Sequence, residues 1–232
     1  MTDRTITRIG GIALIGGALA FMGVFGYLAA RFNYPAVLDG RADTVLPSLL
    51  ATGPQGRMVW AIYAFLPLIW LPAAAGASTA LGRNRPGTMR LAELFAVVAA
   101  LAMMLGLMRW PTIHWELARA FANAGAAERA TMAALFDGLN TYLGNYIGEF
   151  LGELGFSMFF LLTSVAWLSG SQGPRWVGWL GVLTAAAGFL GMFRNVASLV
   201  APIAAMNNYL LPLFMIVLGI ALLRVREVEK RS

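Results

Sequence analysis

The chain has 232 residues, of which 59% are hydrophobic and only 12% charged. This charge share is about half of the usual value in soluble domains, and the apolar residues lie in long uncharged blocks. Cysteine is absent, which excludes disulfides, thiol catalysis and Cys-ligated metals. The 17 basic residues are scattered singly, so no basic stripe predicts a nucleic-acid partner. We therefore expect an α-helical multi-pass membrane protein embedded in a lipid bilayer.

Six apolar stretches are long enough to cross a bilayer as helices. A hydrocarbon core of about 30 Å needs roughly 20 helical residues at ~1.5 Å each. The first stretch lies between Arg8 and Arg31, and the second contains Pro67 and Pro72, which membrane helices tolerate. We expect one all-α transmembrane bundle over residues 1–232. Its predicted spans are 9–30, 58–81, 91–109, 139–168, 176–194 and 205–223.

The distribution of Lys and Arg predicts the orientation of these spans. Six spans place both termini on the same side, and the side that carries more cations faces the cytoplasm. With the termini inside, the inner segments hold ten cations and the outer segments the other seven. We therefore predict cytoplasmic termini. The inner cations are Arg4, Arg8, Arg83, Arg85, Arg90, Arg175, Arg224, Arg226, Lys230 and Arg231.

Both long connections fall on the outer side, at 31–57 and 109–136. Each contains short apolar stretches among turn residues, for example 45–50 and 127–136. Such stretches predict short interfacial helices that cap the outer end of the bundle. Ordinary surface loops are the alternative, since long loops are only sometimes functional.

Polar residues of four spans are predicted to meet in one layer beneath the outer loops. Arg109 lies 18 residues beyond the start of its span at Leu91, and Arg194 lies 18 residues beyond the start of its span at Trp176. At ~1.5 Å per residue, both are about 27 Å along the helix from the cytoplasmic end of the span. Glu149 lies at the same level in its own span. A ligand bound there would meet Arg109, Asn145, Glu149, Glu153, Arg194, Asn195, Asn207 and Asn208.

The fourth span carries the most specific pattern. Asn145, Glu149 and Glu153 are spaced by four residues, which places them on one helix face. A carboxylate within the membrane normally faces the bundle interior and is paired, and Arg194 followed by Arg109 are the expected partners. Beside this face runs a ridge of three glycines, Gly144, Gly148 and Gly152. Such small residues allow another helix to approach closely, in the same chain or in a second copy.

Two chemical interpretations of the carboxylates stay open. Two carboxyls one turn apart in a low dielectric resist ionising together, so one is expected to hold a proton, and Glu149 and Glu153 are the candidate catalytic residues. Alternatively, Glu149 forms an interfacial salt bridge with Arg194 while a protonated Glu153 bonds to a neighbouring helix.

His114 is the only histidine in the sequence. One histidine cannot make a typical zinc or haem site, and no cofactor or metal is predicted. We expect His114 to be an interfacial residue among the tryptophans Trp110 and Trp115.

Three segments resemble a family of small bacterial six-helix membrane proteins described as a domain of unknown function. They are Tyr34-Pro35-Ala36-Val37-Leu38 followed by Val45-Leu46, then Trp60-Ala61-Ile62-Tyr63-Ala64-Phe65, and last Asn207-Asn208-Tyr209-Leu210-Leu211-Pro212-Leu213. The resemblance covers nearly the whole chain. It implies the fold and a bacterial inner membrane, and it brings no activity or catalytic residues.

Three functions are compatible with these patterns, and the sequence ranks them in this order. The first is a non-enzymatic protein that binds or passes a small amphipathic or ionic ligand at the outer polar layer. The second is a structural or regulatory protein without a ligand, in which the glycine ridge could join copies into a homo-oligomer. The third is an intramembrane enzyme of isomerase or cyclase type, with Glu149 and Glu153 as acid and base.

Overall fold

The computed structural model describes residues 1–83 and 85–225, and that part of the chain is helical with no strand. Five segments in it are long and apolar enough to cross a membrane, and they contain five of the six predicted spans. These segments are Asp3–Phe32, Gly53–Leu81, Pro86–Asn123, Ala126–Leu168 and Ser198–Arg224. The one predicted span that is not contained in these segments is 176–194, which corresponds to a helix of 17 residues. The charged tail from Arg226 onward lies outside the described residues.

Prolines lie at the starts of three helices. Pro86 is the first residue of α5, Pro174 directly precedes α9, and Pro202 lies in the first turn of α10. At these positions the missing proline N–H costs no helical hydrogen bond. The α-helices are α1 (Asp3–Phe32), α2 (Ala42–Ala51), α3 (Gly53–Phe65), α4 (Trp70–Leu81), α5 (Pro86–Met108), α6 (Trp115–Asn123), α7 (Ala126–Leu139), α8 (Gly152–Leu168), α9 (Arg175–Gly191) and α10 (Ala201–Arg224). Short 3₁₀ turns are η1 (Ala36–Asp39), η2 (Leu66–Ile69) and η5 (Ser198–Val200), and π-helical segments are η3 (Trp110–His114) and η4 (Asn140–Leu151).

The chain divides into two compact units, which are described separately below. The first unit contains Met1–Leu19, Leu68–Leu101 and the chain from Leu151 onward, and the second contains Ala20–Pro67 and Ala102–Phe150. At each boundary, the chain continues from one unit to the other within a helical element, namely α1, η2, α5 or η4. The single domain expected over the whole chain stays a prediction.

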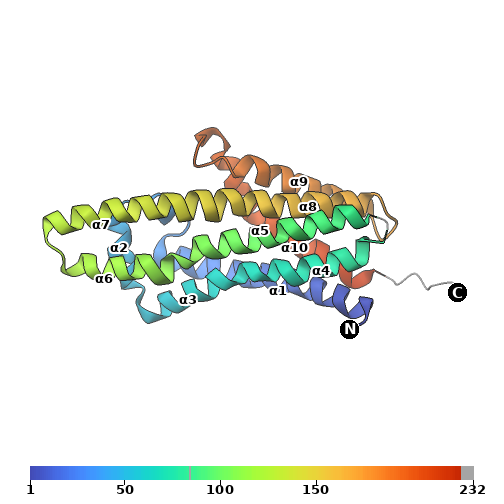
Figure 1. Ribbon diagram of the computed structural model, residues 1–232, viewed down its shortest axis with the longest axis horizontal. Coiled ribbons are helices and arrows are strands. Elements are labelled where there is room, and N and C mark those ends of the chain that lie inside the picture. Colours follow the sequence, from blue (N-terminus) through green and yellow to red (C-terminus); the bar gives the residue numbers. More distant parts are fainter. Residues whose placement is uncertain (84, 226–232) are drawn as a thin grey trace. The chain divides into compact units, whose positions relative to one another are not determined.

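In the first unit, α9 packs against α8 and α10, and Figure 1 shows α8 and α9 side by side. The glycines of α9 explain this close approach. A methyl group at Gly181 would lie 2.3 Å from the Phe214 ring of α10, and one at Gly178 would lie 2.5 Å from Leu168 of α8. Small residues let helix backbones approach closely, which is the usual basis of helix association within a membrane. The glycine content of this span is therefore a packing requirement.

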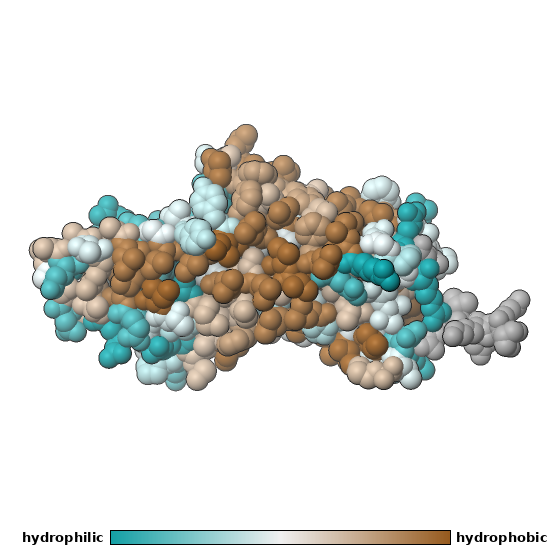
Figure 2. All heavy atoms as spheres, in the orientation of Figure 1, coloured by the Kyte–Doolittle hydropathy of each residue, from teal (hydrophilic) through white to brown (hydrophobic). Residues whose placement is uncertain are grey.

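The first unit also presents apolar side chains outward, and Figure 2 shows hydrophobic surface over α5 and α9. Exposed large side chains on α5 include Leu94, which is 64% exposed, and those on α9 include Trp179 and Leu183. An apolar surface of this extent is unusual for a soluble protein and is expected where a helix contacts lipid. The surface agrees with the composition of a membrane protein.

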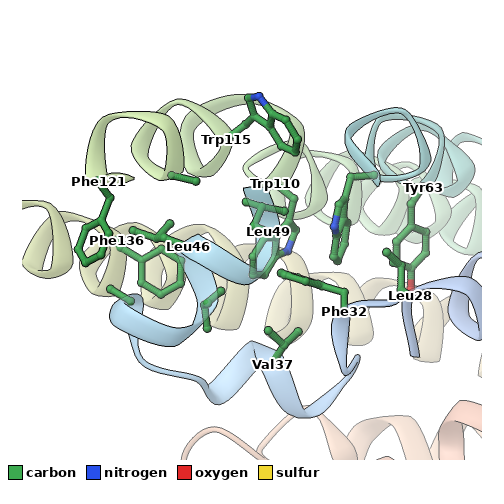
Figure 3. Packing of buried hydrophobic residues seen from close by; sticks show 14 residues of the cluster. Leu28, Phe32, Val37, Leu46, Leu49, Tyr63, Trp110, Trp115, Phe121 and Phe136 are labelled. Carbon is green, nitrogen blue, oxygen red and sulfur yellow. The ribbon is translucent and has the colours of Figure 1, made fainter. Parts of the chain in front are cut away.

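In the second unit, α6 and α7 form an antiparallel hairpin and α2 packs on both (Figure 1). Its core is aromatic: Trp60 and Trp110 stack with ring centroids 4.8 Å apart, and Phe32 meets both rings edge-on. Figure 3 shows Phe32 and Trp110 together with Leu49 of α2 in this core. Aromatic pairs of this kind add about 0.5–1.5 kcal/mol each beyond the burial of their surface.

The connection predicted at 109–136 contains α6 and α7, and each of them continues a spanning segment, Pro86–Asn123 and Ala126–Leu168 respectively. Separate interfacial helices in the outer connections therefore stay a prediction. The backbone N–H of His114 donates to Arg109 O at 2.8 Å, which is a π-type bond between residues five apart. With this bond the helical backbone continues through Pro111. The pattern of hydrophobic residues cannot show such a local change of helix type.

Candidate functional site

The first polar cluster lies in the first unit, around an ion pair between Glu153 and Arg194. Glu153 is in the first turn of α8, and Arg194 is in the turn that follows α9. The guanidinium Nη1 donates to Glu153 Oε1, and the two side chains are only 26% (Arg194) and 14% (Glu153) exposed. Arg194 was the first partner expected for an intramembrane carboxylate, and this pairing is found.

Two further polar side chains of this unit face the same glycine of α9. A methyl group at Gly188 would lie 2.1 Å from Ser157 Oγ and 3.4 Å from Asn207 Nδ2. Ser157 is one turn after Glu153 in α8, and Asn207 was predicted from the sequence in the last span. At the next level, a methyl group at Gly191 would lie 3.4 Å from Glu153 Oε2. We name Glu153, Ser157, Arg194 and Asn207 the Glu153 cluster.

The Glu153 cluster contains buried polar atoms whose hydrogen-bonding capacity is unused. Ser157 is completely buried and Asn207 is 5% exposed. Neither Ser157 Oγ nor Asn207 Oδ1 has a hydrogen-bond partner within the described part of the chain. Buried polar atoms are almost always hydrogen-bonded, because desolvation without a partner costs about 1–3 kcal/mol. The cluster therefore combines a charged pair with neighbours able to bind a further polar group.

The interface of α8 and α9 repeats this arrangement deeper in the helix pair. Ser164 lies seven residues after Ser157, and a methyl group at Gly181 would lie 2.0 Å from its Oγ. Ser164 is 1% exposed, and its hydroxyl likewise has no partner among the described residues. Polar side chains of α8 thus face glycines of α9 at successive levels, which antiparallel packing of the two helices produces.

The second polar cluster lies in the second unit, around Arg109, which is 4% exposed. Its Nε donates to Asn140 Oδ1 at 3.1 Å, and its Nη1 donates to Gly106 O at 2.5 Å. The guanidinium also lies 5.0 Å from the centre of the Trp110 ring. Asn140 in turn donates to Leu38 O at 2.9 Å, which connects this network to η1. We name Arg109, Asn140 and Trp110, with the carbonyl oxygens of Gly106 and Leu38, the Arg109 cluster.

Two tyrosines and Glu149 complete the surroundings of Arg109. The hydroxyls of Tyr34 and Tyr63 are 3.3 Å apart. The charge of Glu149 acts on both Arg109 and Tyr63, so these groups share one electrostatic neighbourhood. The sequence analysis named Arg109 and Glu149 and missed Asn140 and the tyrosines. Tyr34 and Tyr63 stood only in the segments that carry the family resemblance.

The glycine ridge of the fourth span is used within the second unit. A methyl group at Gly148 would lie 2.9 Å from Gly106 Cα, and one at Gly144 would lie 2.5 Å from Arg109 Nη2. The close helix approach predicted from this ridge is therefore present between η4 and α5. Association of two copies through the same residues stays a prediction.

The remaining predicted residues lie near these clusters along the chain. Asn145 is in η4, Asn195 follows Arg194 in the turn after α9, and Asn208 follows Asn207 in α10, and all three are half-buried. Of the predicted residues, Glu153, Arg194 and Asn207 thus lie near one another in the first unit. Arg109 and Glu149 are electrostatic neighbours in the second unit.

His114 differs from its prediction. It is completely buried rather than interfacial, with its ring 4.9 Å from that of Trp110 and 4.6 Å from that of Phe136, centre to centre. Neither ring nitrogen has a hydrogen-bond partner in residues 1–83 and 85–225. This side chain, at the end of the π-helical segment η3, therefore faces the aromatic core of the second unit.

The helices, their apolar surface and the polar clusters define the class of this protein: it has the fold and composition of a multi-pass α-helical membrane protein. The family model of a domain of unknown function, DUF4386, matches residues 9–223. The chain belongs to this family, as the sequence analysis expected. No curated protein and no solved structure matches the chain significantly.

Proposed function

We propose that this chain is a six-span protein of a bacterial inner membrane, with both termini in the cytoplasm. Helix α9 would be the additional span: its 17 residues extend about 26 Å at ~1.5 Å per residue, slightly less than the hydrocarbon core. Its packing against α8 and α10 supports this, and so do its outward apolar side chains such as Trp179 and Leu183, which are expected where a helix contacts lipid. The excess of inner cations supports the orientation.

Single cysteines test this topology on a background that contains none. Ser171 before α9 and Leu199 in η5 after it are both exposed and fall on opposite sides in the proposed topology. A membrane-impermeant maleimide added to intact cells is expected to label Leu199→Cys and to leave Ser171→Cys unlabelled until the cells are opened. The reverse pattern, or labelling of both in intact cells, would contradict the proposal.

We further propose that the Glu153 cluster binds a small ionic or amphipathic ligand. The unpartnered Ser157 Oγ and Asn207 Oδ1 beside a buried ion pair carry this proposal. A pair that served only to join helices would be most stable with all its neighbours hydrogen-bonded, because each unpaired polar atom has a cost. A ligand with a hydrogen-bond donor near a charged group would satisfy Asn207 and meet the Glu153–Arg194 pair.

Native mass spectrometry of the mildly solubilised protein tests this function. The wild type is compared with Glu153→Gln and Ser157→Ala, and Ser164→Ala is the control because it removes an equally buried hydroxyl two turns deeper. We expect a co-purifying molecule in the wild type and in Ser164→Ala that is absent from the other two variants. Bare masses in all four proteins with unchanged thermal stability would contradict ligand binding and favour the structural role. Equal loss in Ser164→Ala would remove the site from this cluster.

A further inference from the structure

A separate cavity of about 770 Å³ lies in the second unit, between α2 and the hairpin of α6 and α7. We name it the α2–α7 groove. No residue of the Glu153 cluster or the Arg109 cluster lines it, so an inference drawn from it does not depend on the function proposed above. Its lining residues are Arg41, Ala42, Asp43, Pro47, Leu50, Ala51, Ala118, Phe121, Ala122, Ala126, Arg129, Ala130, Ala133 and Asp137.

The inner surface of the groove is apolar because small side chains leave space between its three helices. Alanines supply half of the lining residues, and Leu50, Pro47 and Phe121 supply most of the remaining apolar surface. On α7 the lining positions 126, 129, 130, 133 and 137 follow helical spacing, so one face of that helix forms one wall. A largely apolar surface of this volume is the usual form of a site for one small molecule.

The edges of the groove carry balanced charges. Arg41 and Asp43 stand at the start of α2, and Arg129 and Asp137 stand on α7, so each wall offers one positive and one negative side chain. The Arg41–Asp43 pair is 3.5 Å apart with side chains 86% and 59% exposed, and such surface pairs are weak. Both groups can therefore exchange this contact for one to a ligand at little cost.

Arg129 is held at the edge of the groove by two contacts. Its Nε donates to Phe121 O at 3.2 Å, and its guanidinium lies 5.2 Å from the centre of the Phe121 ring. A cation fixed beside an apolar surface is prepared to bind an anionic group whose attached chain lies on that surface. Figure 2 shows hydrophilic side chains gathered around the α6–α7 end of this unit.

We propose that the α2–α7 groove binds one single-chain zwitterionic amphiphile. The hydrocarbon chain lies on the alanine surface, the phosphate meets the arginines, and the ammonium meets the aspartates. A head group with both charges matches walls that each carry both, whereas a net anion or net cation would meet a like charge on each wall. The volume corresponds to one small molecule rather than a two-chain lipid.

Two tryptophan variants test the site by filling it. Ala130 lines the groove and is exposed, so Ala130→Trp occupies the cavity without entering the core. Ala127 is equally exposed on the same helix but does not line the groove, so Ala127→Trp is the matched control. Lysophosphatidylcholine is titrated onto each purified protein, and native mass spectrometry counts the bound molecules, with thermal unfolding as a check of folding.

We expect the wild type and Ala127→Trp to bind one lysophosphatidylcholine and Ala130→Trp to bind it at least about tenfold more weakly. A monoacylglycerol of the same chain length, which has no charge, should bind more weakly than lysophosphatidylcholine to the wild type and to Ala127→Trp. The double variant Arg129→Gln, Asp137→Asn keeps the net charge and should reduce this preference, because Arg41 and Asp43 remain. Equal binding by folded Ala130→Trp would overturn the site. Equal binding of the monoacylglycerol or of two-chain phosphatidylcholine to the wild type would overturn the proposed ligand.

Discussion

Each compact unit of this protein contains an arginine that is largely shielded from solvent, and the two arginines have different surroundings. In the second unit, Arg109 bonds to the neutral oxygens of Asn140 and Gly106 and lies over Trp110. In the first, Arg194 bonds to the carboxylate of Glu153, and the neighbouring Ser157 and Asn207 each keep an unpartnered polar atom within the described residues. A buried arginine alone therefore does not indicate a binding site, and unpartnered atoms alone do not either, since both ring nitrogens of His114 in the second unit also lack partners among the described residues. An ion pair directly beside unpartnered polar atoms does.

The largest effect should come from removing Arg109. Arg109→Ala leaves Asn140 Oδ1 without its partner, which typically costs about 1–3 kcal/mol, and the space opened over Gly144 adds the cost of a cavity, for a total of about 3–5 kcal/mol. We expect a loss of this size in the free energy of unfolding, measured by denaturant titration in mixed micelles. Arg119→Ala is the control, because the Arg119 side chain pairs with Glu116 at the surface, where solvent screens the pair, so this variant should change little. Equal effects of both variants would contradict the assignment of Arg109 as the centre of a structural network.

An intermediate effect is expected at the glycine ridge of the same unit. A methyl group at Gly148 would lie 2.9 Å from Gly106 Cα, so Gly148→Ala forces two helical segments apart, at a cost of about 1–3 kcal/mol. Gly138 lies in α7 with open space around it, and Gly138→Ala should stabilise by up to about 1 kcal/mol through helix propensity. Thermal unfolding of the two variants measures both signs. A stable Gly148→Ala protein would show that the ridge is not tightly packed within the chain.

The smallest effect is expected at the surface. Arg57 and Glu116 pair at 3.3 Å, with side chains 43% and 57% exposed, so solvent screens their attraction. Glu116→Gln should change the free energy of unfolding by less than about 1 kcal/mol. A larger loss would mean that surface pairs, and not only the buried clusters, hold the second unit together.

Five of the six spans and part of the polar clusters could be predicted from the sequence for physical reasons that can be named. Long uncharged blocks have few alternatives to membrane helices, and a carboxylate within such a block requires a cation, which led to Glu153 and Arg194. The network of Arg109 could not be predicted in the same way. It depends on Leu38 O, which lies 102 residues from Asn140 in the chain, and on a π-helical segment. Burial of His114 was not predicted because it depends on packing against Phe136, which lies 22 residues further along the chain.

The sign of two alanine substitutions tests the central contrast most directly. After bound molecules are removed by washing, thermal unfolding is measured for Ser157→Ala and Asn140→Ala beside the wild type. Ser157→Ala removes an unpartnered buried hydroxyl and should raise the midpoint, whereas Asn140→Ala removes two hydrogen bonds of the Arg109 cluster and should lower it. Opposite signs are the predicted result. A lowered midpoint in both variants would show that Ser157 is part of a structural network, and would contradict the assignment of the Glu153 cluster as the ligand site.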